Sequence, residues 1–249
     1  MSQKVLVLLV VGAGVSLFLM VSCRSLERTL LFYPTHRPAD GVLSPWIKDG
    51  RVIGYARVVA SPGNVWLMLH GNGGQAEDRT YALPSFSPRD SVYILEYPGY
   101  GNREGTPSSK SFNAAAQEAY ALLRSTYPKI PICVAGESIG SGPASLLAGL
   151  DRPPDKFVFV VPFDRLSHVA KDHYPSLVVG LLLSNDWDNA KALAVYKGPV
   201  EIFGAKDDEI IPVKHALALA GAIPGTKFVL IDGGHNDWSH QGQVKFRNP

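Results

Sequence analysis

Cysteine and charged residues are scarce in this chain of 249 residues. The two cysteines are Cys23 and Cys133, and no cluster of cysteine and histidine has the spacing of a zinc site, which needs about four ligands. Cys133 lies in an apolar run and is expected to be a buried thiol, with a Cys23–Cys133 disulfide as the alternative. Charged residues make up 18%, the formal net charge is +2, and no basic tract is dense. The composition therefore argues against nucleic-acid binding.

Phosphate-binding signatures are missing as well. The chain has neither a Walker motif nor a G-x-G-x-x-G sequence, so we expect no nucleotide cofactor and no metal. Hydrophobic residues make up 46% of the chain, which indicates a globular protein. No repeat and no linker divides the body, so residues 30–249 are expected to form one domain.

Residues 5–21 contain no charged side chain and show no polar face. Such a run predicts a signal sequence or a short membrane helix rather than a core helix. It is followed by MVSC at residues 20–23, which resembles a bacterial lipobox. We therefore expect residues 1–23 to be the leader of a cell-envelope lipoprotein attached at Cys23. An uncleaved N-terminal membrane anchor and a plain secretory signal are the alternatives.

Strand and helix signals alternate through the body of the chain. Short runs that are apolar on both faces are typical of parallel strands covered by helices. They lie at residues 65–69, 92–95, 130–135, 157–161, 200–203 and 227–231. Between the second and third run, residues 112–123 follow helical spacing. The pattern predicts an α/β fold with a mostly parallel, doubly wound sheet and helices on both faces. Residues 163–195 break the rhythm and are predicted to form a small cap, with a plain crossover helix as the alternative.

The sequence GESIG at residues 136–140 matches the G-x-S-x-G motif. A strand-like run precedes it and small residues typical of a helix start follow it, which is the context that this motif needs. We therefore predict that Ser138 is a nucleophile on a strained turn, where flanking side chains would collide with the neighbouring strand and helix. A glycine- and serine-rich turn without chemistry is the alternative.

A serine nucleophile needs an imidazole base, and a carboxylate to orient that base. His235 follows the last predicted strand. In this motif's fold the nucleophile, the acid and the histidine follow one another in that order along the chain, so the base is expected at this position. The acid is expected after residues 200–203, where Asp207 and Asp208 are adjacent. We favour Asp208 over Asp207, and Glu209 is a third alternative.

An oxyanion hole needs preorganised N–H groups. The amide of Ile139, next to the nucleophile, is expected to be one donor. The second is expected in the glycine-rich sequence HGNGG at residues 70–74. Here Asn72 is favoured over Gly71, while His70 is expected to be structural.

From about residue 30 onward the chain resembles the α/β-hydrolase superfamily. It is most similar to membrane-associated serine hydrolases that include protein depalmitoylases and their bacterial relatives. The matching sequences are LFYP at 31–34, HGNG at 70–73, EYPGYG at 96–101, GESIG at 136–140 and GHND at 234–237. Residues 102–104 depart from the family pattern, and so does an extra residue between Gly204 and Pro212, which keeps the acid assignment open.

The resemblance implies a serine hydrolase that acts through an acyl-enzyme. A carboxylic ester or thioester with an acyl chain is the expected substrate, because a membrane tether would hold the site near lipids. This substrate class is inferred by analogy, since the fold hosts many chemistries. A serine peptidase and a non-catalytic binding protein on the same scaffold are the alternatives.

Overall fold

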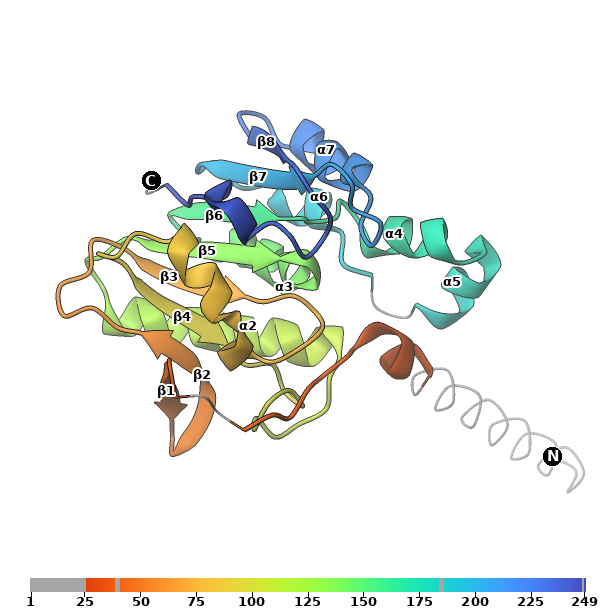
Figure 1. Cartoon of the computed structure of the whole chain (residues 1–249). Coiled ribbons are helices and arrows are strands. Elements are labelled where there is room, and N and C mark those ends of the chain that lie inside the picture. Colours follow the sequence, from red (N-terminus) through yellow and green to blue (C-terminus); the bar gives the residue numbers. More distant parts are fainter. Residues whose placement is uncertain (1–25, 39–40, 184–185, 248) are drawn as a thin grey trace, which may run out of the picture.

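Eight strands form one sheet in the order β1-β2-β4-β3-β5-β6-β7-β8 (Figure 1). The computed structural model describes residues 26–38, 41–183, 186–247 and 249, so the predicted leader lies outside the described residues. The strands are β1 (Ser44–Lys48), β2 (Arg51–Arg57), β3 (Val65–Leu69), β4 (Ser91–Leu95), β5 (Ile132–Glu137), β6 (Lys156–Val160), β7 (Val200–Ala205) and β8 (Lys227–Ile231). Strands β3 to β8 are parallel, whereas β1 and β2 pair in antiparallel fashion. The predicted mostly parallel sheet is confirmed.

The six apolar runs of the sequence correspond to β3 to β8. The hairpin of β1 and β2 is the difference, since the first strand that the sequence predicts lies at residues 65–69. In β1 only Trp46 is buried, because the strand lies at the edge of the sheet. An edge strand that buries one side chain carries too weak an apolar pattern to be recognised in advance.

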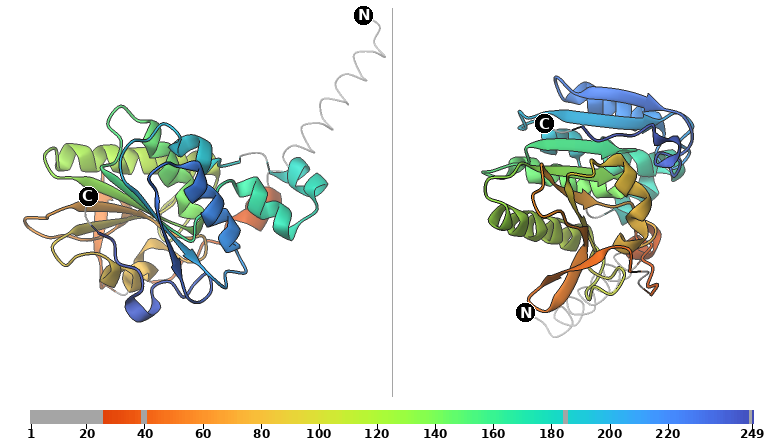
Figure 2. Two further views of the ribbon diagram at one scale, coloured as in Figure 1. Left: turned by 90° about the horizontal axis from the view of Figure 1, so that it is seen from above. Right: turned by 60° about the vertical axis from the view of Figure 1, so that its left-hand side comes forward.

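Helices lie on both faces of the sheet (Figure 2), and an apolar layer fills the space on each face. Leu67 of β3 packs in the layer under the α-helices, whereas Trp66 and Met68 pack in the opposite layer. The first layer is covered by α2 (Ser109–Thr126), α3 (Ser141–Leu146), α6 (Asn189–Leu193) and α7 (Val213–Ala222). The second is covered by the 3-10 helix η1 (Ala76–Ser85) and the C-terminal chain near Phe246. Short 3-10 turns are η2 (Ser138–Gly140), η3 (Leu147–Gly149) and η4 (His240–Gly242).

Two further helices, α4 (Leu166–His173) and α5 (Ser176–Leu182), lie beyond the carboxyl ends of the strands (Figure 1). They belong to the segment predicted to be a cap, and that assignment stays a prediction. The helical turn of residues 26–31 lies at the same end of the molecule. None of the helices in the described residues combines the length and the apolar character needed to cross a membrane.

Cys133 lies on the central strand β5 as a free, fully buried thiol. Burial raises the pKa of this thiol to about 12. Because the thiolate is the reactive form, the group is inert at neutral pH. The expectation of a buried thiol is confirmed, while Cys23 lies outside the described residues.

His215 on α7 is held between two carboxylates from the segment that contains α4. Its Nδ1 lies 2.9 Å from Oδ1 of Asp164, and its Nε2 lies 2.8 Å from Oδ2 of Asp172. Both ring nitrogens can donate only in the protonated imidazole. Burial alone would lower the pKa of His215, but the hydrogen bonds to the two carboxylates outweigh it and raise that pKa above its usual value. Nearby, His168 contacts Asp164 and Lys214 contacts Asp172.

This contact predicts a pH-dependent stability. A histidine with a raised folded pKa contributes stability that is fully present below its unfolded pKa, about 6.5, and is lost as the pH rises through the folded pKa. The difference in free energy of unfolding between wild type and His215→Gln should therefore shrink with rising pH in urea denaturation series. His240→Gln, at an exposed histidine outside this contact, serves as the control. A difference for His215→Gln that stays constant across the range would contradict the prediction.

Candidate active site

Ser138 follows β5 directly and has a φ of 52°. This left-handed conformation is strained for a residue with a Cβ atom. A Cβ atom at Gly140 would overlap the carbonyl oxygen of Leu69, and one at Gly136 would lie 2.9 Å from Cα of Ser141. The expected strained turn, with no space for flanking side chains, is confirmed.

The structure brings Ser138, His235 and Asp208 together at the carboxyl ends of the strands. Nε2 of His235 lies 2.9 Å from Oγ of Ser138, and its Nδ1 lies 2.7 Å from Oδ2 of Asp208. The other oxygen of Asp208 accepts hydrogen bonds from the amides of Ile210 and Ile211, at 3.0 and 2.7 Å. These two amides fix the carboxylate, and the carboxylate in turn fixes the imidazole ring.

The two competing acids lie elsewhere on the same loop. Asp207 is exposed, and its amide donates to the carbonyl oxygen of Gly233 at 3.0 Å. Glu209 is also exposed, whereas the Asp208 side chain is only 1% exposed. Of the three carboxylates, Asp208 is the one that contacts His235.

The loop after β3 contains the two candidates for the second oxyanion donor. The amide of Gly71 donates to Oε2 of Glu137 at 2.9 Å. An amide that is bonded to a buried carboxylate is not available to a substrate, which favours Asn72 over Gly71. Ile139 lies next to Ser138 in η2, where its amide is near the nucleophile.

The side chain of Asn72 joins this loop to the N-terminal segment. Its Oδ1 accepts from the amide of Tyr33 at 3.1 Å and from the hydroxyl of Tyr100 at 2.8 Å. Its Nδ2 donates to the carbonyl oxygen of Leu31 at 2.7 Å. The backbone of residues 31–33 therefore fixes the side chain of Asn72 in the candidate oxyanion loop.

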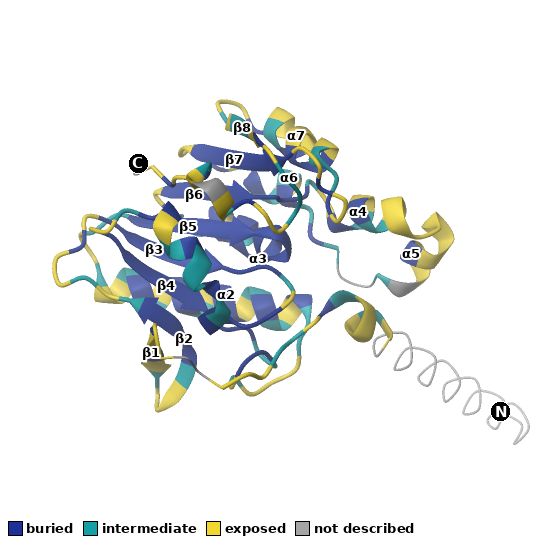
Figure 3. Cartoon of the chain, in the orientation of Figure 1, coloured by how far each residue is buried: buried dark blue, intermediate teal, exposed yellow. Residues whose placement is uncertain are grey.

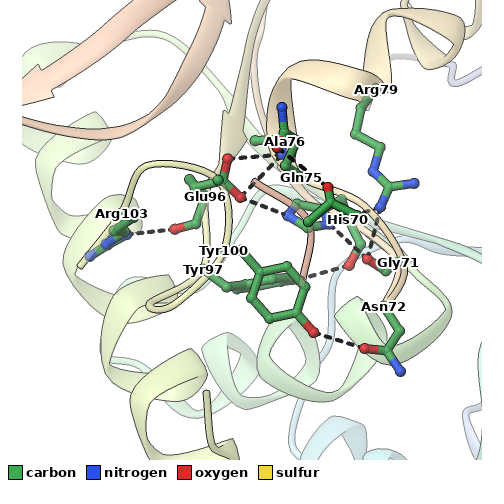
Figure 4. A network of polar contacts seen from close by, with 12 residues as sticks. His70, Gly71, Asn72, Gln75, Ala76, Arg79, Glu96, Tyr97, Tyr100 and Arg103 are labelled. Carbon is green, nitrogen blue, oxygen red and sulfur yellow. Dashed lines mark hydrogen bonds and ion pairs between the residues drawn. The ribbon is translucent and has the colours of Figure 1, made fainter. Parts of the chain in front are cut away.

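His70 lies under the same loop and is fully buried. Its Nδ1 lies 2.7 Å from the carbonyl oxygen of Gly71, and its own carbonyl oxygen accepts from the hydroxyl of Tyr97 at 2.9 Å (Figure 4). Glu96 lies on its other side, with Oε1 at 3.5 Å from Nε2. These contacts agree with the expected structural role of His70.

Glu137, the residue before the nucleophile, is a buried hub that the sequence did not single out. Its Oε1 accepts from the Tyr81 hydroxyl at 2.8 Å and from Nε1 of Trp238 at 2.9 Å, while Oε2 accepts from Gly71. Burial alone would raise the pKa of Glu137, but the charge of Arg79 and these three hydrogen bonds lower it. The available signal was a carboxylate inside an otherwise apolar strand. Glu137 thus joins the nucleophile turn to the glycine loop and to the segment after His235.

Metal ligands do not gather at this site. Within the residues that the structure describes, no group of three or more His, Cys, Asp or Glu side chains is arranged to hold a metal ion. The polar groups around Ser138 instead form the hydrogen-bonded contacts given above. Such a serine, imidazole and carboxylate arrangement can activate a hydroxyl for attack on a carbonyl carbon.

Glu137→Gln should destabilise the fold by about 1–3 kcal/mol. The new amide group would place an N–H donor against the donors that now bind the carboxylate, and it would remove a negative charge that stabilises Arg79. Glu104→Gln is the control, since it makes the same change at an exposed glutamate. Its cost should stay below about 1 kcal/mol. Chemical denaturation measures both. Equal losses for the two variants would contradict the role of Glu137 as a hub.

Comparisons with known proteins agree on one family, although no family model matches the chain. The uncharacterized protein Rv2307c of Mycobacterium tuberculosis is 30% identical over an alignment that covers 94% of this chain and 87% of that relative. The lysophosphatidylserine lipase ABHD12 of Danio rerio is 30% identical over 64% of this chain, and the aligned part is 47% of its own length.

Solved structures share the fold. An α/β hydrolase from Vibrio vulnificus matches with a TM-score of 0.61 and 20% identity, over 77% of this chain and 72% of that chain. A hydrolase from Pseudomonas aeruginosa also reaches 0.61, with 14% identity, over 82% of this chain and 95% of that chain. Sequence identities this low support only a shared fold. Together with the lysophosphatidylserine lipase relatives, they show that the chain belongs to the α/β-hydrolase superfamily.

Proposed function

We propose that this protein is a serine hydrolase that cleaves carboxylic esters or thioesters of acyl chains through an acyl-enzyme. The observation that carries the proposal is the continuous contact from Ser138 to His235 to Asp208, at 2.9 and 2.7 Å. In this arrangement the imidazole accepts the hydroxyl proton at Nε2, while Nδ1–H donates to the carboxylate and fixes the tautomer.

The first half of the reaction is acylation. Nε2 of His235 takes the proton of Ser138 as Oγ attacks the carbonyl carbon, and the carbonyl oxygen becomes an oxyanion. The backbone amides of Asn72 and Ile139 are the proposed donors to this oxyanion. The imidazolium then gives its proton to the leaving alcohol or thiol as the bond to the carbonyl carbon breaks.

The second half is hydrolysis of the acyl-enzyme. His235 takes a proton from water, whose oxygen attacks the ester carbonyl of acylated Ser138. Collapse of this second intermediate returns the proton to Oγ and releases a carboxylic acid. Asp208 stays ionised throughout and stabilises the imidazolium in both halves.

An acyl or lipid-like substrate is favoured over a peptide for two reasons. Several relatives carry the name lysophosphatidylserine lipase, although this chain spans about half the length of those proteins. The uncharged run at residues 5–21 would also keep the site near lipids if it acts as a tether. A long-chain acyl ester such as lysophosphatidylserine is therefore the first substrate to try.

We expect Ser138→Ala to abolish labelling by a fluorophosphonate probe, because the probe reacts with an activated serine hydroxyl. Hydrolysis of nitrophenyl esters and of lysophosphatidylserine should fall with it. Asp208→Asn should lower kcat by about 10⁴-fold, because the imidazole then adopts the wrong tautomer.

Asp207→Asn is the matched control, since it makes the same change on the neighbouring exposed residue. It should keep labelling and rate close to wild type. Labelling that survives in Ser138→Ala would remove the proposed nucleophile. Turnover of peptides but not of esters would favour a peptidase, and no labelling of the wild type would favour a binding protein.

We also propose that the N-terminus tethers the protein to a membrane, through acylation at Cys23. The sequence of residues 20–23 and the uncharged run before it support this. Intact-mass measurement of the purified protein should show a chain that begins at a lipid-modified Cys23. An unmodified N-terminus at Met1 would instead favour the uncleaved anchor, and an unmodified shorter chain would favour a secretory signal.

A further inference from the structure

Large apolar side chains are exposed at the end of the molecule that carries the candidate site. Figure 3 shows that most of α5 is exposed there. The sequence of α5, SLVVGLL, has no charged residue, and its Leu177 and Leu181 are 76% and 69% exposed. Tyr174 precedes α5 and is also largely exposed. Across from α5, Leu26 and Leu30 of the helical turn at 26–31 point to solvent as well. We call these five side chains the apolar face.

The two parts of the apolar face meet in a groove. It is lined by Leu30, Leu31, Tyr174, Val178, Val179 and Leu183, with Glu27 and Ala170 completing it. Exposed apolar side chains are common when scattered singly, but a contiguous patch indicates a surface that another apolar partner covers.

The apolar face is connected to both sides of the candidate site. On one side, the carbonyl oxygen of Leu31 accepts from the side chain of Asn72 in the glycine loop. On the other side, Nε2 of His173 at the end of α4 lies 2.9 Å from the carbonyl oxygen of Ile210. The amide of Ile210 in turn donates to Asp208. A partner on the apolar face would therefore contact segments that are hydrogen-bonded to the glycine loop and to the loop of Asp208.

We infer that the apolar face docks on a lipid bilayer and turns the site toward it. The chain itself points to this partner, because the uncharged residues 5–21 end only five residues before Leu26 in the sequence. The exposed basic residues Arg28 and Lys171 adjoin the apolar face and suit anionic headgroups. Apolar side chains on a short helix with basic neighbours are the composition of an interfacial segment. Docking by this face is a second membrane contact, distinct from the proposed tether, and does not depend on hydrolysis.

The test places a tryptophan on the apolar face of the full-length protein. The four native tryptophans are buried, so Leu177→Trp or Leu181→Trp introduces an exposed tryptophan. The variants are bound to vesicles of phosphatidylcholine and phosphatidylglycerol, with phosphatidylcholine brominated on its acyl chains. An interfacial helix sinks about 5–10 Å into the bilayer surface. The bromines should therefore quench the added fluorescence.

Leu230→Trp on β8 is the matched control, because Leu230 is a similarly exposed leucine outside the apolar face. This variant should bind the vesicles as well as the others, but the fluorescence of its added tryptophan should not be quenched. Circular dichroism confirms that each variant is folded. Equal quenching at Leu177, Leu181 and Leu230, or none at the first two, would overturn the inference. If the added tryptophan is shielded from iodide quenching without vesicles, residues 5–21 would instead cover the apolar face. If that shielding depends on protein concentration, a second copy of the chain would be the cover. Either result also overturns bilayer docking.

Discussion

The hydrogen bonds of Glu137 connect segments that lie far apart in the sequence. One oxygen binds the amide of Gly71, and the other binds Tyr81 and Trp238, while Arg79 supplies the opposite charge. A buried carboxylate is costly unless it is paired and hydrogen-bonded, so these partners are needed together. Because Glu137 directly precedes Ser138, the same contacts fix the nucleophile turn relative to the glycine loop.

The strained turn at Ser138 depends on this surrounding order. A residue with φ of 52° is held there only when its neighbours determine the backbone. The strands on either side of β5 are fully buried. Gly140 lets the turn approach Leu69 at the end of β3, and Gly136 lets β5 approach the start of α3. The rigid sheet thus supports the strain, and the contact of Ser138 with His235 needs no further movement in this structure.

The N-terminal segment contacts both the glycine loop and the region of α5. Residues 31–33 contact Asn72, and residues 26–31 form half of the groove next to α5. If the N-terminus binds a membrane, the contacts of Leu31 and Tyr33 with Asn72 would connect the membrane-bound segment to the candidate oxyanion loop. This physical continuity makes the proposed substrate class and the proposed docking surface consistent with each other.

The fold could be predicted from sequence to a large extent. Strands buried on both faces are apolar throughout, so β3 to β8 are visible as runs, and the G-x-S-x-G motif follows one of them. The position of His235 after the last strand follows from the order of elements. The edge strand β1 could not be predicted, because it buries only Trp46.

The sequence by itself determined the parallel sheet, the turn at Ser138 and the loop that carries His235, since each depends on local pattern. It left Asp207 and Asp208 open, because two adjacent side chains on a loop differ mainly in direction. Only the tertiary structure decided that Asp208 contacts His235 and that Glu137 joins three segments. These contacts link residues 27 to 101 positions apart, and local patterns carry no information on such directions.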